Sequence, residues 1–379
     1  MKKTKFISLI LKVSFTVLLM AGKTFFPAGA PAHAALVFEE PVFPEVIVSG
    51  RAIAMGNAYI AHVSDAAAAF YNPAGLGSMR GSEFSLSNFL VEANRDWFEI
   101  ESSSDNHGYF DHAQNGFSAD GIRKMLLLNR DRMMQQRIQF LPNFTTRYLT
   151  FGYLFSNMLR GYLGPESSDQ YEFATRRDHG PYLATNFSLG GGIFKLGASV
   201  MYLNRREAQG AVAPGTELDI HQYYAKGKAI IFTGGTKLTL PWAWLPTFAV
   251  TWHNMGQNKF TSEQGVPMRD ILSTIDVGFG ITPLLSHESR LHLEVNYKDL
   301  RRKYSDLKNS RLWLVGLELD FFRVVYLRAG YGDGYLSGGF GLKTKHASLD
   351  VSAYQVATKL ENHDHYADRR LAVALSANI

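Results

Sequence analysis

The sequence predicts an all-β fold, a transmembrane antiparallel β-barrel of about fourteen strands, within a range of about twelve to sixteen counted from Ser82 onward. Apolar and polar residues alternate in segments of about ten residues, turn clusters separate these segments, and glycine and aromatic residues are abundant. The segment 290–298 shows the alternation clearly. One face of it carries Leu291, Leu293, Val295 and Tyr297, and the other carries Arg290, His292, Glu294, Asn296 and Lys298.

The same alternation recurs in 194–202, 274–281 and 313–319, but it also describes the strands of a soluble β-sandwich. The connections favour the barrel. Short glycine turns such as 190–192 and 332–334 alternate with long polar stretches such as 205–222 and 254–269, which is typical of outer-membrane barrels. The last segment, 370–379, is an alternating strand similar to the C-terminal insertion signal of such barrels, although Ile379 stands where an aromatic residue is usual.

The N-terminus has the order of a secretory signal peptide, which we place at residues 1–34. Lysines precede an apolar run from Val13 to Gly22, and the small-residue site Ala32-His33-Ala34 follows it. Removing this segment takes five lysines away, so 34 basic residues face 34 acidic ones. The mature chain is therefore near neutral, which argues against a nucleic-acid partner. The absence of cysteine excludes disulfides and thiolate metal sites.

One segment departs from the strand pattern. Between Ala119 and Gln136, apolar residues recur at helical spacing, and Ser118 is a suitable N-cap. We expect a short amphipathic helix near 118–136, inserted in a barrel that otherwise spans 81–379. Its apolar face either packs on protein or forms a lid at the barrel mouth or the membrane surface.

Residues 35–80 form a separate segment whose composition indicates tight packing. Small residues recur between Gly50 and Gly77 without a clean period, so backbone can approach backbone, as in a chain threaded through a confined lumen. Asn72 precedes Pro73 and is biased away from helical backbone, while Gly75 can accept a left-handed turn. The sequence therefore predicts a sharp, rigid corner at Asn72-Pro73-Ala74-Gly75.

This segment resembles the opening signature of the FadL-like family of outer-membrane barrels. The resemblance lies in Gly50, Arg51, Ala52, Met55, Gly56, Ala58, Ser64-Asp65 and Tyr71-Asn72-Pro73-Ala74-Gly75-Leu76. The later stretch 327–354 is similar to the final hairpins of the PorV-like branch, which serves protein secretion. The resemblance implies that 35–80 is a hatch closing the barrel near its periplasmic side. It also implies structural or gating roles for Gly50, Arg51, Gly56, Asp65, Asn72, Pro73, Ala74 and Gly75, with Arg51, Asp65 and Asn72 fastening the hatch to the lumen.

The inward faces of the predicted strands are polar and carry charges of both signs. We place Lys195, Asp276, Glu294, Arg328, Asp350 and Arg370 on them. A lumen of this kind offers little continuous apolar path. An apolar ligand would therefore need a pocket in the loops or the hatch, or an exit through the barrel wall.

Enzymatic and metal chemistry find little support, and we predict no enzyme, no cofactor and no metal. A Gly-x-Ser-x-Gly elbow, a Walker loop and a His-Glu-x-x-His helix are all absent. The residues around His363-Asp364-His365, with Glu361 and Asp368, and a pair formed by His107 and His112 could hold a transition metal. Polar loops commonly carry such residues for solubility.

The sequence and the resemblance together lead to an expected function. The chain would be a Gram-negative outer-membrane barrel that passes small hydrophobic molecules, such as long-chain fatty acids, by passive transport gated by the hatch. Its partners would be outer-membrane lipid and a small hydrophobic ligand. The alternative is a PorV-like barrel that holds a secreted protein and conducts nothing, and a plain porin ranks last.

Overall fold

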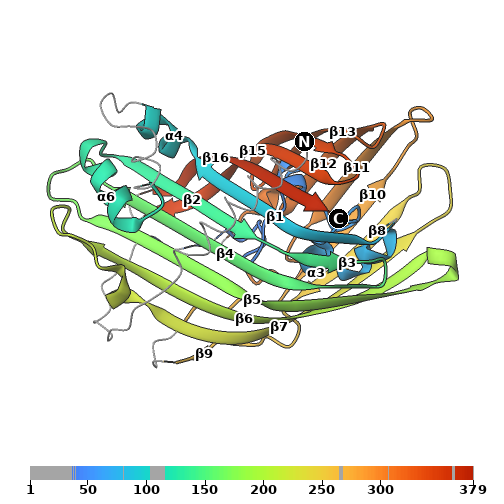
Figure 1. Cartoon of the computed structure of the whole chain (residues 1–379), viewed down its shortest axis with the longest axis horizontal. Helices are drawn as coiled ribbons and strands as arrows, with labels where there is room; N and C mark the ends of the chain where they lie inside the picture. The colour runs from blue at the N-terminus through green and yellow to red at the C-terminus, as the bar shows by residue number, and fades with distance from the viewer. Residues whose placement is uncertain are drawn as a thin grey trace, which may run out of the picture.

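The structure is a computed structural model that describes residues 36, 38, 40–79, 81–102, 116–263, 268–305, 307–360 and 363–378. Its strands form one antiparallel sheet that closes on itself where β1 (Glu83–Asn94) pairs with β16 (His363–Asn378) (Figure 1). The expected signal peptide, residues 1–34, lies outside the described residues. The strands between β1 and β16 are β2 (Arg132–Phe140), β3 (Asn143–Thr145), β4 (Leu149–Leu163), β5 (Tyr171–Leu189), β6 (Phe194–Val212), β7 (Ala225–Thr239), β8 (Thr247–His253), β9 (Thr261–Ser262), β10 (Thr274–Ile281), β11 (Ser289–Tyr297), β12 (Trp313–Phe321), β13 (Val325–Gly332), β14 (Tyr335–Lys343) and β15 (Ala347–Leu360).

The barrel wall has fourteen strand positions, which confirms the predicted number. Strands β2 and β3 both pair with β1 and β4, so they are one wall strand interrupted at Leu141 and Pro142. Strand β9 pairs only with β7 and extends the wall locally. The interruption lies at Pro142 because proline has no backbone N–H to donate to the neighbouring strand.

The two ends of the barrel differ in their connections. One end carries short turns, among them 146–148, 190–193 and 322–324. The other end carries the long connections, with helices α4 (Arg95–Ser102) and α6 (Ala119–Leu128) and the short helices η3 (Ile220–Tyr223) and η4 (Asn309–Leu312) (Figure 1). We call these the short-turn end and the long-loop end. This asymmetry is typical of outer-membrane barrels, whose short turns face the periplasm.

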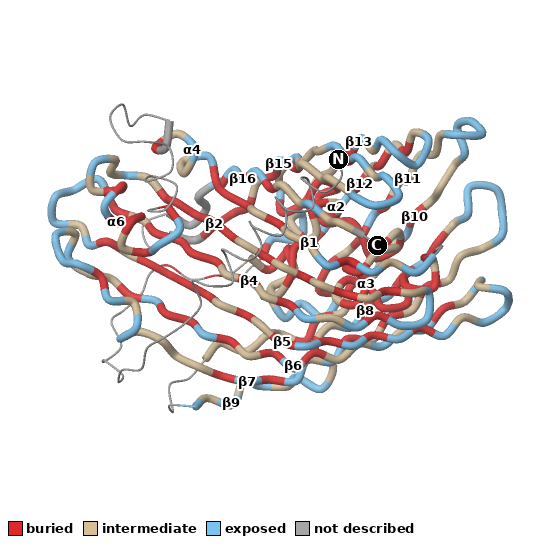
Figure 2. Tube along the Cα trace, viewed as in Figure 1, coloured by how far each residue is buried: buried red, intermediate tan, exposed pale blue. Residues whose placement is uncertain are grey.

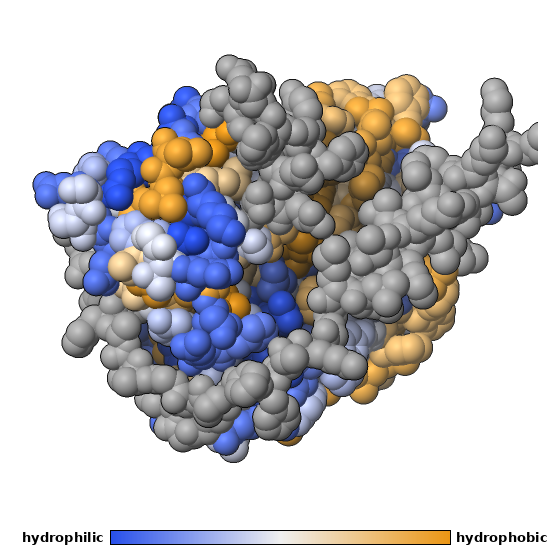
Figure 3. Space-filling view, turned by 60° about the vertical axis from the view of Figure 1, so that its left-hand side comes forward, coloured by the Kyte–Doolittle hydropathy of each residue, from blue (hydrophilic) through white to orange (hydrophobic). Residues whose placement is uncertain are grey.

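The predicted alternation holds along the strands, where buried and exposed residues follow one another (Figure 2). Exposed apolar side chains on the outer face include Leu183, Phe187, Leu196, Phe232 and Trp313. In Figure 3 the wall is mainly hydrophobic, whereas the long-loop end brought forward is mainly hydrophilic. An outward apolar band flanked by aromatic residues is the surface that a membrane-inserted barrel presents to lipid.

The interior of the barrel is ionic. Arg137, Arg160 and Arg205 are among the largest fully buried side chains. The predicted inward charges are on the inner face, where Lys195, Asp276, Glu294, Arg328 and Arg370 are buried and Asp350 is partly exposed. Charges of opposite sign pair there, as in the contact of 2.7 Å between Arg328 Nε and Glu318 Oε2.

Helix α6 is shorter than expected, because it ends at Leu128 and the residues from Arg132 belong to β2. Ser118 is its N-cap, as predicted, and accepts a hydrogen bond of 3.0 Å from the Gly121 nitrogen. The apolar face of the helix packs with outward residues of β4 and β5, including Leu159 and Phe173. Helix α6 therefore covers the outside of the wall at the long-loop end. No helix in the described ranges combines the length and apolarity needed to cross a membrane.

Candidate functional site

Residues 40–79 lie inside the barrel, towards the short-turn end, and we call them the plug (Figures 1 and 2). The plug contains three short helices, α2 (Gly50–Ala54), α3 (Ala68–Tyr71) and η1 (Pro73–Ser78). Its small residues pack without solvent contact, as Ala52, Ala54, Ala58 and Ala68 show. Packing of this density explains why the sequence has no clean period here.

Inward-facing glycines on one side of the wall form a seat for α2. A Cβ added at Gly330 would lie 2.1 Å from the carbonyl carbon of Met55 and 2.2 Å from the nitrogen of Gly56. Gly56 itself has a φ of +62°, which a glycine adopts without strain. On β15, two strands from Gly330, Ser352 Oγ donates a hydrogen bond of 2.7 Å to the Gly50 carbonyl oxygen. The plug backbone thus rests directly on the wall backbone.

The corner at Asn72 and Pro73 has a second glycine seat, on β6 and β7. A Cβ added at Gly197 would lie 2.2 Å from the Ala74 nitrogen, and one added at Gly235 would lie 2.0 Å from Asn72 Oδ1. The Asn72 amide donates to the carbonyl oxygens of Ile60 (3.0 Å) and of Thr236 in the wall (3.2 Å). Asn72 therefore fixes the corner and also joins it to the barrel.

The backbone of this corner agrees with the prediction at Asn72 and differs from it at Gly75. Asn72 is extended, with φ −162° and ψ 103°, and its side chain accepts a hydrogen bond from the Ala74 nitrogen. Gly75 has no left-handed φ and lies inside η1. Glycine is required there because Val63 approaches closely, since an added Cβ would lie 2.4 Å from Val63 Cγ1.

Arg51 forms a bidentate ion pair between the plug and the wall. Its Nε and Nη2 donate to the two carboxylate oxygens of Glu318 at 2.7 and 2.6 Å. Its Nη1 donates to the Tyr59 hydroxyl at 3.0 Å. Bidentate pairing of this kind is charge-assisted and strongly directional. Glu318 is fully buried and also accepts from Arg328, so one carboxylate serves two arginines.

Asp65 contacts the plug itself, in contrast to its predicted contact with the lumen. Its Oδ2 accepts a hydrogen bond of 2.5 Å from the Tyr59 hydroxyl, and its Oδ1 accepts one of 3.0 Å from the Ala67 nitrogen. Burial raises the pKa of Tyr59 well above its usual range, although Arg51 opposes this effect and Asp65 reinforces it. The phenol therefore stays neutral and able to donate.

Sequence reasoning missed the second attachment of the plug, at Glu294. This carboxylate accepts hydrogen bonds from the backbone nitrogens of Ala61 (2.7 Å) and His62 (3.0 Å). It also contacts His62 Nδ1 at 2.9 Å. Glu294 was predicted to face inward, but nothing in the sequence pairs it with residues more than 200 positions away. Two of these three contacts are with backbone nitrogens, which leave no signal in the residue types.

Two acidic residues before α2, Glu40 and Glu45, were also missed. Glu40 pairs with Arg160 and Arg370, and Glu45 pairs with Arg205 at 2.6 Å and Arg176 at 3.1 Å. Burial raises the pKa of Glu40, but Arg370, Arg160 and Arg137 outweigh it and hold that pKa well below its usual range. The plug thus supplies negative charge to a wall rich in inward arginines.

A cavity of about 680 Å³ opens at the short-turn end, below the plug. Its lining mixes apolar residues with charged ones, which include Arg51, Asp65, Lys195, Lys237 and Glu318. On the other side of the plug, a pocket of about 20 Å³ lies beside Phe38 and Arg176. The charged residues in both linings disfavour a continuous passage for an apolar molecule.

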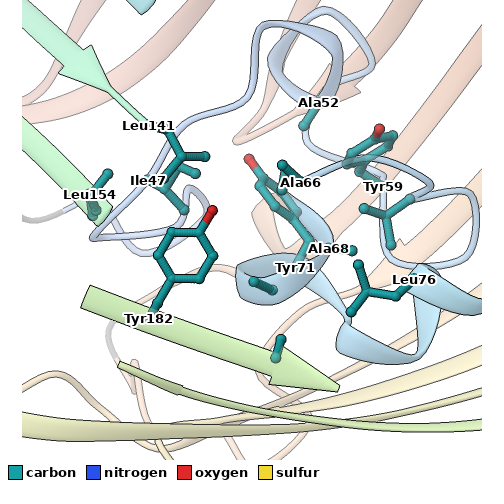
Figure 4. Close-up of a cluster of buried hydrophobic side chains, with 14 of the residues drawn as sticks. Ile47, Ala52, Tyr59, Ala66, Ala68, Tyr71, Leu76, Leu141, Leu154 and Tyr182 are labelled. Carbon is teal, nitrogen blue, oxygen red and sulfur yellow. The ribbon is translucent and has the colours of Figure 1, made fainter. Parts of the chain in front are cut away.

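An apolar sector interrupts this polar lumen where the plug faces β4, β5 and β6. Leu154, Tyr182 and Leu203 contribute wall side chains, and Tyr71 and Leu76 are among the plug side chains in the same cluster. Figure 4 shows Tyr182 rising from its strand toward Ile47 and Leu141. Phe70 packs on Tyr182 with ring centroids 4.8 Å apart. These rings belong to an apolar cluster that joins the plug to the wall.

Next to this sector, the pairing between β5 and β6 is interrupted. His179 pairs with Asn204 and Tyr182 pairs with Met201, but Gly180 and Pro181 between them have no partner on β6. A proline in a strand removes a backbone donor, and a glycine weakens the strand. The wall is therefore locally weaker beside the apolar sector.

The described residues contain no group of three or more His, Asp or Glu placed to hold a metal ion. Asp368, one candidate ligand, pairs with Arg370 in the lumen. His107, His112 and Glu361, and the side chains of His363, Asp364 and His365, lie outside the described residues. The predicted absence of a metal stays a prediction.

Comparisons with known proteins show the fold. No family model and no curated protein matches the chain. Among solved structures, the CymD monoaromatic hydrocarbon channel aligns at 11% identity over 89% of this chain and 98% of that chain, with a TM-score of 0.52. A TodX monoaromatic hydrocarbon channel, the deltaS2 mutant, aligns at 11% identity over 87% and 98%, with a TM-score of 0.50.

The chain has the fold of the FadL-family hydrocarbon channels. The FadL-like resemblance of the sequence is thereby confirmed as a likeness of architecture. Both of these solved structures are described as channels, and the lack of enzymatic activity in this chain stays a prediction. The narrower likeness to the PorV-like branch stays a prediction.

Proposed function

We propose that this chain is an outer-membrane barrel that lets small hydrophobic molecules cross by passive movement, with the plug as its gate. The apolar sector around Phe70 and Tyr182 carries the proposal, because it is an apolar surface beside the plug on which such a molecule can bind without losing hydrogen bonds. The fold shared with monoaromatic hydrocarbon channels supports it.

The proposed path avoids the charged cavity below the plug. A hydrophobic molecule reaches the apolar sector when the plug shifts, and then leaves through the wall near Gly180 and Pro181, where β5 lacks partners on β6. An apolar molecule moves into lipid without a cost in free energy. Its entry into the charged cavity is unfavourable, because polar groups there would lose contact with water. The substrate class includes monoaromatic hydrocarbons and long-chain fatty acids.

The experiment measures uptake of radiolabelled toluene and oleate by Gram-negative cells that lack hydrophobic-compound transporters of their own. We expect the wild-type chain to restore uptake of at least one probe, and Phe70→Asp to reduce it about tenfold, because a carboxylate in the apolar sector repels the probe. Leu128→Asp is the matched control, since Leu128 is exposed at the end of α6.

Two results would overturn the proposal. One is that neither probe enters faster than in cells without the chain, while cross-linking captures one abundant secreted protein, as a PorV-like barrel would. The other is steady ion conductance of the unmodified barrel in planar bilayers, as a plain porin would give. Heat-modifiable migration of each variant in gels, which reports the folded barrel, separates loss of uptake from loss of folding.

A further inference from the structure

Three basic residues form a row on the outer face of the barrel. Arg177 on β5 pairs in register with Arg206 on β6, and Arg206 pairs in register with Lys226 on β7. They point outward, because their neighbours Arg176 and Arg205 are buried in the lumen. Directly opposite residues on adjacent strands have Cβ atoms about 5 Å apart, and like charges there repel one another.

In the part of the chain that the structure describes, no carboxylate forms a direct ion pair with the row, although the charge of Glu263 reaches Lys226 and Arg206 from a greater distance. No carboxylate there lies within 4.0 Å of any of the three cationic groups. Glu263 pairs with the neighbouring Lys228 at 2.5 Å. The side-chain contact of Arg177 is with Asn157 Oδ1 at 3.5 Å, a neutral partner. Three adjacent cations with no carboxylate in direct contact indicate that an anion from outside the chain binds them.

The position of the row along the barrel axis indicates which part of the membrane surrounds it. On β5 the exposed outward residues below Arg177 include Leu183, Phe187 and Leu189. The twelve residue steps from Leu189 to Arg177 correspond to about 40 Å along the strand and about 28 Å along the membrane normal at a tilt of about 45°. The row thus stands at the upper edge of an apolar band as tall as a bilayer core.

Aromatic residues mark the same edge. Tyr153 and Tyr202 are exposed four residues below the row along their strands, and the Tyr153 hydroxyl contacts His179 Nδ1 at 2.7 Å. Such residues lie at the level of lipid headgroups in outer-membrane barrels. Above the row, the outer wall is covered, since Phe173 is buried against Tyr223 of η3. The cations therefore occupy a strip between the apolar band and the loops.

We propose that Arg177, Arg206 and Lys226 bind the phosphate of a membrane lipid at the outer surface of the bilayer. This inference rests on the proposed location in an outer membrane, whose outer leaflet contains phosphorylated lipid A. Guanidinium groups bind phosphate through paired charge-assisted hydrogen bonds, and the lysine adds a further charge. A bound phosphate would also remove the repulsion between the three side chains.

The test uses the full barrel in phosphatidylcholine nanodiscs and titrates three probes: bisphosphorylated lipid A, dephosphorylated lipid A and phosphatidylglycerol. Bound lipid is counted by native mass spectrometry. The variant is Arg177→Gln/Arg206→Gln/Lys226→Gln. Its matched control is Arg301→Gln/Lys303→Gln/Lys308→Gln, which removes three exposed cations from the β11–β12 connection.

We expect the wild type and the control to bind bisphosphorylated lipid A, and the row variant to bind it roughly a hundredfold more weakly. Dephosphorylated lipid A should bind equally weakly to all three. Tighter binding of phosphatidylglycerol than of lipid A would identify a phospholipid as the source of the phosphate. It would still support the proposal that the row binds a lipid phosphate.

Equal retention of bisphosphorylated lipid A by the wild type and the row variant would overturn the inference. So would equal binding of the two lipid A forms by the wild type, a comparison that needs no variant to fold. Failure of the wild-type barrel to enter the nanodiscs at all would instead contradict the membrane location on which the proposed function depends.

Discussion

Gly330→Ala is expected to unseat the plug while leaving the barrel closed. The new Cβ would lie 2.1 Å from the Met55 carbonyl carbon, where backbone and not a flexible side chain must give way. Overpacking of this kind costs about 1–3 kcal/mol, and more when backbone must move. Ion conductance in planar bilayers should therefore rise from a closed baseline to frequent open events, and protease should cut the chain near α2.

Gly338→Ala is the matched control, because Gly338 lies on β14 and an added Cβ there would meet no atom closer than 3.4 Å. It should behave as the wild type in both assays. Unchanged conductance and unchanged protection from protease in Gly330→Ala would contradict the glycine seat and, with it, the tight contact between plug and wall.

Glu318→Gln is expected to cause the largest loss of stability. The substitution leaves Arg51 without its carboxylate and removes one of the two carboxylates that pair with Arg328. Removing one partner of a buried ion pair costs about 3–5 kcal/mol, because the remaining charge stays buried without compensation. The midpoint of urea unfolding in lipid vesicles should fall accordingly, and conductance should rise as the plug loosens.

Glu288→Gln is a suitable control, since Glu288 is exposed in the turn before β11. An equal urea midpoint for Glu318→Gln and Glu288→Gln would show that the ion pair between Glu318 and Arg51 contributes little to the stability of the protein. Loss of stability without increased conductance would mean that Glu318 stabilises the barrel wall but does not hold the plug in place.

Much of the barrel can be predicted from the sequence, because its strands carry two unlike faces. The alternation in β11 places Leu293 outside and Glu294 inside, and no distant residue is needed to infer it. The end of α6 was misplaced because Met133 and Gln136 fit a helical spacing, but pairing of β2 with β1 and β4 overrides that local pattern.

The attachments of the plug could be predicted only in part. Arg51 and Asn72 belong to a recognisable motif, whereas Glu40 and Glu45 are isolated acidic residues whose arginines lie more than a hundred positions away. One signal was available. Gly330 and Gly332 stand on the inward face of a strand, where missing side chains indicate that another part of the chain packs against the wall.

The central claim is that hydrophobic molecules pass only when the plug moves, and a reversible cross-link tests it most directly. The chain has no cysteine, so Gly50→Cys with Ala374→Cys introduces one pair, at positions where a Cβ on Gly50 lies 3.2 Å from the Ala374 Cβ, close to the spacing of a disulfide. Uptake of toluene or oleate should stop on oxidation and return on reduction, with each single-cysteine variant unaffected. Equal uptake by the oxidised and reduced forms would contradict the gate.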